Sequence, residues 1–83
     1  MIPATNIPTS VDEPNWEPLE RALPLHQCSD FMYMGRAGEI ELYKHHMTRR
    51  YLNIGRDAQT FYHYVEGRYV EVSRTTALDH VYG

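Results

Sequence analysis

Residues 31–73 read FMYMGRAGEIELYKHHMTRRYLNIGRDAQTFYHYVEGRYVEVS, and apolar or aromatic residues alternate with polar ones through most of this stretch. Such a period of two, rich in Tyr, Phe, Ile and Val and broken by glycine-containing turns, is typical of β-strands. Because the breaks are short, consecutive strands are expected to pair with each other as an antiparallel meander of five strands. The predicted strands are residues 31–34, 39–45, 49–54, 59–65 and 68–73.

A short helix is predicted before the strands. Trp16, Leu19 and Leu23 recur at helical spacing, and Asn15 stands before them where a cap is needed. Pro24 follows and ends the helical pattern, because proline cannot continue a helix from its preceding turn.

A second short helix is predicted after the strands, where Thr76 and Asp79 have the spacing of a capping box. We expect both helices to pack on one face of the sheet, which makes residues 15–83 a single α+β domain. Residues 1–14 carry prolines among small and polar residues without apolar periodicity, and they are expected to form an extended or disordered arm.

The composition narrows the class of protein. The chain has 83 residues, one cysteine and a net charge of −3, so a disulfide framework and a domain-wide basic footprint for duplex nucleic acid are excluded. No apolar run approaches the roughly 20 residues of a membrane span, and residues 1–6 lack the pattern of a secretory signal. We therefore expect a cytoplasmic protein with no membrane partner.

The lengths of the turns predict which side chains share a face of the sheet, because directly opposed residues do. A two-residue turn at Glu66 and Gly67 and similarly short turns elsewhere give one apolar row that should face the helices. This predicted inner row is Phe31, Leu42, Leu52, Phe61 and Val72.

The same pairing places tyrosines on the opposite face, which a two-layer domain leaves open. Tyrosine and arginine are enriched at binding hot spots, and a contiguous aromatic patch on a surface usually marks contact with another molecule. We therefore predict that this face binds a partner. The predicted contact residues are Tyr43, Tyr51, Tyr62, Tyr64, Tyr69, Arg49 and His45.

Two kinds of partner fit a face of this composition. A protein, including a second copy of the chain in a homodimer, would use the tyrosines as interface anchors. Single-stranded nucleic acid is the alternative, because its bases stack on aromatic side chains. A third interpretation gives the tyrosines a structural role only, as cross-strand pairs or beneath the N-terminal arm.

No catalytic, cofactor or metal-ligating residues are predicted. The five histidines lack the spacing of a zinc motif, and Cys28 is interpreted as an inert thiol. A less favoured hypothesis is acid–base cleavage of RNA, since helices against an antiparallel sheet resemble the architecture of small ribonuclease toxins, without a matching motif. That hypothesis would use His45, Arg49, Tyr51, Tyr64 and Glu71.

Overall fold

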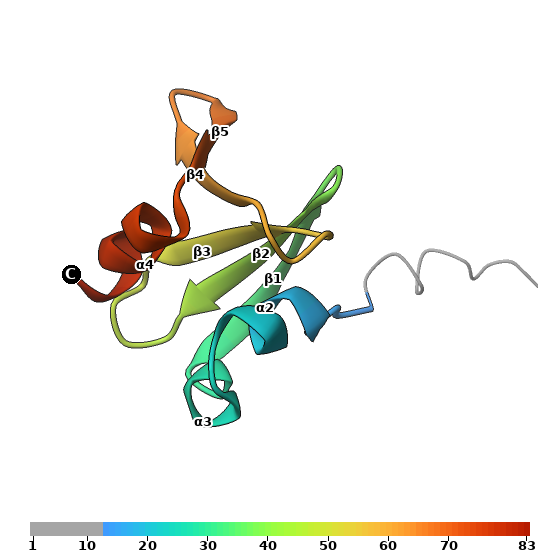
Figure 1. Cartoon of the computed structure of the whole chain (residues 1–83), viewed down its shortest axis with the longest axis vertical. Coiled ribbons are helices and arrows are strands. Elements are labelled where there is room, and N and C mark those ends of the chain that lie inside the picture. The colour runs from blue at the N-terminus through green and yellow to red at the C-terminus, as the bar shows by residue number, and fades with distance from the viewer. Residues whose placement is uncertain (1–12) are drawn as a thin grey trace, which may run out of the picture.

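The meander is the framework of the computed structural model, which describes residues 13–83 (Figure 1). The strands follow one another in the order β1-β2-β3-β4-β5, and each pairs antiparallel with the next. The predicted five-stranded antiparallel sheet in an α+β fold is therefore confirmed, while the expected arm at 1–14 falls almost entirely outside the described residues. The elements are α2 (Glu17–Ala22), α3 (Leu25–Cys28), β1 (Phe31–Ala37), β2 (Ile40–His45), β3 (Tyr51–Gly55), β4 (Phe61–Val65), β5 (Arg68–Val72) and α4 (Arg74–Tyr82).

The last hairpin has the predicted register. Glu66 and Gly67 have φ angles of 50° and 84°, so both central residues of the turn are left-handed, as a two-residue hairpin turn of type I′ requires. Val65 therefore lies opposite Arg68, and the pairing continues down to Phe61 opposite Val72.

The first hairpin differs from the prediction. β1 does not end at Met34 but continues to Ala37, and the register shifts between Tyr33 and Gly35, which has a φ of 111°. A bulge of this kind inserts a residue into one strand and bends it. The turn itself lies at Gly38, so the glycine that was expected to begin the turn sits inside the strand.

The turn between β2 and β3 differs from the prediction, and as a result the side chains of β2 face the opposite sides of the sheet from those predicted. It runs through residues 46–49, one residue longer than predicted, because Arg49 adopts a left-handed φ of 66° and His45 pairs with Arg50 through its backbone N–H. Tyr43 therefore lies opposite Leu52. A slip of one residue turns every side chain of a strand over, so the prediction that Leu42 faces the helices is wrong.

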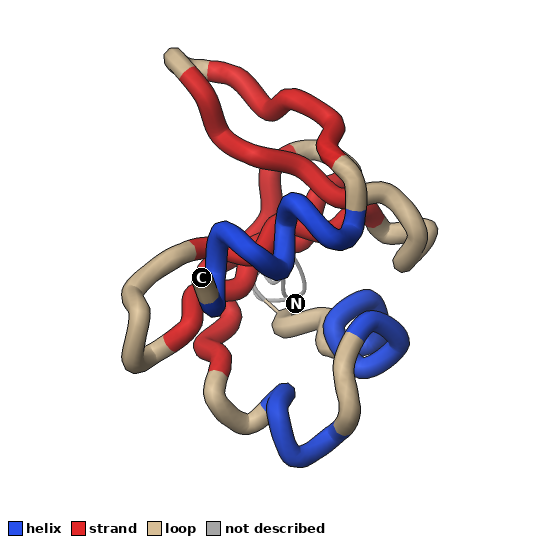
Figure 2. Tube along the Cα trace, turned by 60° about the vertical axis from the view of Figure 1, so that its left-hand side comes forward, coloured by secondary structure: helices blue, strands red, loops and turns tan. Residues whose placement is uncertain are grey.

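The helices cover one face of the sheet, as predicted (Figure 2). α4 packs on β3 and β4, and α2 packs on β3. Two details differ: a separate helix α3 follows α2, and the N-cap of α4 is Ser73 rather than Thr76, so the helix begins at Arg74. The core is formed by Leu19, Ala22, Leu23, Cys28, Phe31, Tyr43, Leu52, Ile54, Phe61, Ala77 and Val81.

The β4–β5 hairpin projects from the body of the sheet, as both views show (Figures 1 and 2). β4 pairs with β3 only through Phe61 and Tyr62, whereas its pairing with β5 continues to Val65 at the tip. The outer part of this hairpin is therefore a two-stranded ribbon. Among the described residues, no helix is long and apolar enough to cross a membrane.

We predict that Ser73→Ala lowers the free energy of unfolding by about 1 kcal/mol, the usual cost of losing an N-terminal cap. The Ser73 hydroxyl oxygen accepts from the backbone N–H of Thr76 at 3.1 Å. Urea unfolding followed by circular dichroism measures the change. Thr75→Ala, at an exposed position in the first turn of the same helix, is the control and should change stability little; equal losses in both variants would refute the capping role of Ser73.

Candidate functional site

The face of the sheet opposite the helices carries most of the predicted contact residues. Alternation along each strand and the observed cross-strand pairs assign its members. Met32, Tyr51 and Tyr64 on this face are 43%, 36% and 62% exposed. We call it the outer face, and it consists of Met32, Ile40, Leu42, Lys44, Tyr51, Asn53, Tyr62, Tyr64, Tyr69 and Glu71.

Two contacts organise the aromatic side chains of the outer face. The rings of Tyr64 and Tyr69 lie opposite each other on the projecting hairpin, with their centroids 4.9 Å apart. The ammonium group of Lys44 lies 5.9 Å from the centre of the Tyr51 ring, within the range of a cation–π contact. Burial, followed by the neighbouring Tyr64 and Tyr51, raises the pKa of Tyr69, so its hydroxyl remains a neutral donor.

Tyr43 does not lie on the outer face, and its predicted placement there is wrong. Its side chain is fully buried on the helix side, where its ring packs against Trp16 at 5.8 Å and its hydroxyl donates to the backbone carbonyl of Asn15. Burial raises its pKa, so it is neutral throughout the physiological range. The longer β2–β3 turn is the physical reason for the error.

His45 was also placed on the wrong face. It is 6% exposed, and its ring packs edge-on against Phe31 and Tyr82. Its Nδ1 accepts from the backbone N–H groups of Met47 and Thr48 at 3.1 and 3.2 Å. The imidazole thus holds the turn after β2 together, and it is not available to a partner of the outer face.

Arg49 lies in this same turn and is exposed. Its left-handed φ of 66° directs the chain into β3, and its backbone N–H donates to the carbonyl of His45. Of the predicted contact residues, the structure therefore brings Tyr51, Tyr62, Tyr64 and Tyr69 onto one face, keeps Arg49 in the adjoining turn, and assigns Tyr43 and His45 to the core.

The hypothetical acid–base set for RNA cleavage is not assembled. His45 lies beneath the helices, whereas Tyr64 and Glu71 lie on the opposite face of the sheet. A general base must come within hydrogen-bond reach of the group it deprotonates, and the sheet itself separates these side chains. In residues 13–83, no group of three or more His, Cys, Asp or Glu side chains is arranged to hold a metal ion.

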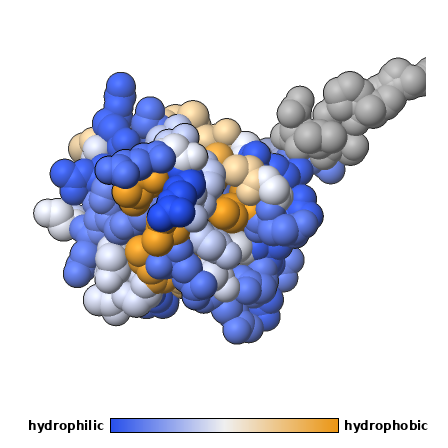
Figure 3. Space-filling model, turned by 90° about the horizontal axis from the view of Figure 1, so that it is seen from above, coloured by the Kyte–Doolittle hydropathy of each residue, from blue (hydrophilic) through white to orange (hydrophobic). Residues whose placement is uncertain are grey.

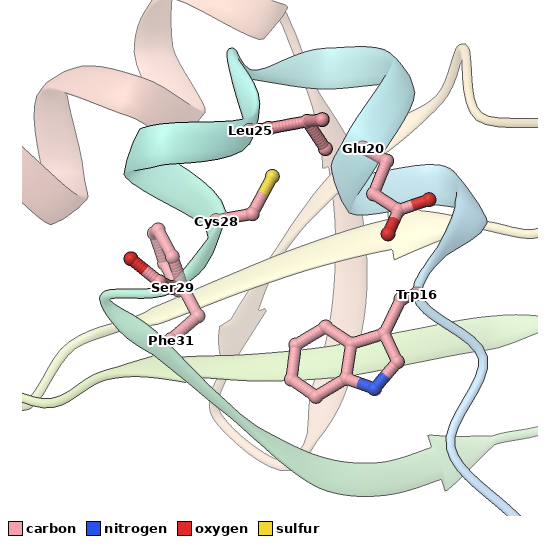
Figure 4. Close-up of a pocket in the computed structure, with 6 residues that line it drawn as sticks. All are labelled: Trp16, Glu20, Leu25, Cys28, Ser29 and Phe31. Carbon is pink, nitrogen blue, oxygen red and sulfur yellow. The ribbon is translucent and has the colours of Figure 1, made fainter.

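A hollow of about 380 Å³ lies on the helix side, between α2, α3 and β1 (Figure 4). Cys28 and Glu20 are among its lining residues. The thiol of Cys28 donates to the carbonyls of Leu19 and Leu23, and burial, followed by the negative charge of Glu20, raises its pKa. A raised pKa keeps the thiol of Cys28 protonated, and a protonated thiol is a weak nucleophile.

A polar cluster surrounds Glu41, which is fully buried on the inner face, and no residue of this cluster was predicted as a site residue. Its carboxylate accepts from the hydroxyl of Tyr33 at 2.5 Å and from the guanidinium Nε of Arg36 and Arg56 at 3.1 and 3.2 Å. The side-chain amide of Asn15 completes the set at 3.4 Å. A buried carboxylate needs such partners, because an unpaired charge away from water is strongly unfavourable.

The charges of the cluster set the protonation state of its members. Burial alone would raise the pKa of Glu41, but the hydrogen bonds from Tyr33, Arg36, Arg56 and Asn15 outweigh it and lower that pKa. Burial and the bond to Glu41 raise the pKa of Tyr33 to about 12. The sequence did contain a signal, because an arginine stands near each of the two turns at the Ile40 end of β2. Arg36 precedes the β1–β2 turn, and Arg56 lies in the β3–β4 turn.

Comparison with known proteins adds no relative. No family model matches the chain, and neither the curated proteins nor the solved structures contain a significant match to it.

We predict that Glu41→Gln lowers the free energy of unfolding by about 3 kcal/mol at pH 7, because it removes the buried carboxylate to which Arg36 and Arg56 donate. The pKa of Glu41 is lower in the folded chain than its usual 4.5, so its stabilising contribution is present above that value and is lost as the pH falls below it. The difference between the parent and the variant should therefore narrow towards pH 3.

Urea unfolding at several pH values measures this difference. Glu39→Gln is the matched control, because the Glu39 side chain is 82% exposed and makes one surface ion pair with Arg56. Its cost should stay below about 1 kcal/mol. A Glu41→Gln variant as stable as the Glu39→Gln variant would show that the cluster does not stabilise the fold.

Proposed function

We propose that the protein is a non-catalytic binding module that contacts a protein partner through the outer face. One observation carries the proposal: among the described residues, helices α2 and α4 pack on the inner face, while the outer face keeps Met32, Tyr51 and Tyr64 partly exposed. Large apolar and aromatic side chains gathered on one open surface are typical of an interface with another molecule.

The reversal of β2 strengthens the preference for a protein partner. It removes Glu41 and His45 from the outer face and puts Ile40, Leu42 and Lys44 there instead. The face thereby gains two aliphatic side chains, Ile40 and Leu42, and becomes more apolar. Apolar residues with tyrosine at their centre are typical of protein interfaces.

The charges at the rim indicate the chemistry of the partner. Lys44 and Arg49 lie at the end of the sheet where β2 turns into β3, and Glu71 is the outer face's acidic side chain, on β5. A partner with an apolar surface and acidic groups at its edge would match the β2–β3 end. The proposed compartment is the cytoplasm, which the single free thiol of Cys28 supports.

We predict that Tyr51→Ala combined with Tyr64→Ala leaves the fold intact and removes partner binding. Both rings are exposed and neither belongs to the core, so circular dichroism and the fluorescence of the partly buried Trp16 should be unchanged. Quantitative pull-down from cell extract with parent and variant baits measures the loss, expected to be tenfold or more for a pair of hot-spot residues.

Leu25→Ala is the control for this experiment, because Leu25 is 71% exposed on α3, on the helix side. Its bait should recover the same proteins as the parent. Equal recovery by the tyrosine variant and the parent would place the binding surface elsewhere.

Single-stranded nucleic acid is the second candidate, favoured by the contact between Lys44 and Tyr51 and by the removal of Glu41 from the face. We predict for it that a short single strand quenches tyrosine fluorescence at low salt and that the affinity falls steeply as salt is added. An unchanged tyrosine signal at low salt would eliminate this candidate.

A further inference from the structure

The β5 edge of the sheet has no further strand beside it within residues 13–83, and it borders the outer face. β5 pairs with β4 on one side and is the last strand of the sheet. Proteins protect such edges with bulges, prolines or lysines. The opposite edge strand, β1, has a bulge between Tyr33 and Gly35, whereas β5 is regular from Arg68 to Val72, without a bulge, proline or lysine, and its charged residues are Arg68 and Glu71.

The register of the hairpin identifies the backbone groups that β5 leaves free. Val65 and Arg68 close a two-residue turn and form a hydrogen-bonded pair, and hydrogen-bonded and non-hydrogen-bonded pairs alternate from there. The N–H and C=O groups of Tyr69 and Glu71 therefore point away from β4. Outside the sheet ladder, no backbone hydrogen bond within residues 13–83 involves either residue.

We propose that this edge pairs with β5 of a second copy of the chain, antiparallel and with Val70 on the two-fold axis. The free groups of Tyr69 and Glu71 can pair only with free groups of the other strand, and opposed residues must share a face. Centring on Val70 meets both conditions, because it sets Tyr69 opposite Glu71 of the other copy and Val70 opposite its own counterpart.

Complementarity favours this register over its neighbours. A shift towards the carboxyl end of β5 would set Glu71 opposite Glu71, which is unfavourable for like charges. A shift towards the turn would set Glu71 opposite Gly67, which offers no side chain. With Val70 at the centre, apolar meets apolar, and the Tyr69 hydroxyl lies beside a carboxylate that can accept from it.

The exposed apolar side chains of the β4–β5 hairpin support a second copy of the chain as the partner of the β5 edge. Val65 and Val70, on the same side of the ribbon, are 45% and 37% exposed, and apolar surface is visible among polar side chains from above the hairpin (Figure 3). A two-stranded ribbon alone is marginally stable in water, and pairing two ribbons gives four strands. The dimer would join the sheets of both copies edge to edge, with the two outer faces on the same side.

The first test is the solution mass of the full chain, measured by light scattering after size exclusion at several concentrations. The parent should be a dimer, and Val70→Lys should weaken the dimer at least about tenfold, because it opposes two ammonium groups at the axis. Val65→Lys is the matched control: the side chain lies on the same side of the same hairpin but on the inner strand, and the dimer should persist.

The second test is cross-linking, which does not depend on how Val70→Lys folds. Cysteines at a non-hydrogen-bonded antiparallel pair are close enough for a disulfide. Val70→Cys should therefore cross-link under mild oxidation, whereas Val65→Cys should not, and Cys28 is buried in both.

Three results would overturn the inference. They are a parent that is monomeric at all concentrations, equal cross-linking of the two cysteine variants, and a dimer that Val70→Lys leaves unchanged. A dimer lost only in the Tyr51 and Tyr64 double variant would place self-association on the outer face. The proposed function fails independently, because its partner binding is measured with the tyrosine variant.

Discussion

The arrangement of the sheet depends on the need to surround the buried carboxylate of Glu41 with hydrogen-bond donors. A charge with no exposed surface must have hydrogen-bond donors around it, and these come from separate segments: Asn15 before α2, Tyr33 and Arg36 on β1, and Arg56 after β3. The N-terminal segment is fastened in the same place, because the Arg36 guanidinium also donates to the backbone carbonyl of Glu13. Only a β2 that turns Glu41 towards the helices can satisfy these contacts.

That orientation of β2 determines what both faces of the sheet present. With Glu41 inside, Tyr43 and His45 must also face inward, where they pack against Trp16 and Phe31. Ile40, Leu42 and Lys44 then lie on the outer face beside the tyrosines of β3 and β4. The open surface is therefore an apolar and aromatic one with a basic end, which is the basis of the proposed protein contact.

Much of the fold could be predicted because local chemistry specified it. The two-residue turn at Glu66 and Gly67 fixes the register of the last hairpin, and the period of two in β3 places Leu52 and Ile54 inside correctly. The orientation of β1 was also predicted correctly. The longer β2–β3 turn reverses the faces of β2, and the bulge in β1 reverses the pairing a second time, so that Phe31 still faces the helices.

The orientation of β2 could not be predicted from hydrophobicity, because both of its faces carry large apolar side chains, Ile40 and Leu42 on one and Tyr43 on the other. Hydropathy favours the aliphatic pair inside, and the long-range hydrogen bonds of Glu41 reverse that choice. The left-handed conformation of Arg49 leaves no clear mark in the sequence, whereas Gly35 is such a mark but fits the start of a turn as well as a bulge. The tyrosines on β3, β4 and β5 were assigned to the correct face. The registers of these strands differ from the prediction by an even number of residues or not at all, and such a shift leaves each side chain on its face.

The orientation of β2 can be measured directly in solution by two-dimensional nuclear Overhauser spectroscopy of the folded chain. The ring centroids of Trp16 and Tyr43 are 5.8 Å apart, so cross-peaks should connect the indole protons of Trp16 with the ring protons of Tyr43. The methyl groups of Leu42 should show no contact with Trp16. Cross-peaks from Leu42 to Trp16, with none from Tyr43, would contradict the buried carboxylate cluster and the outer face derived from it.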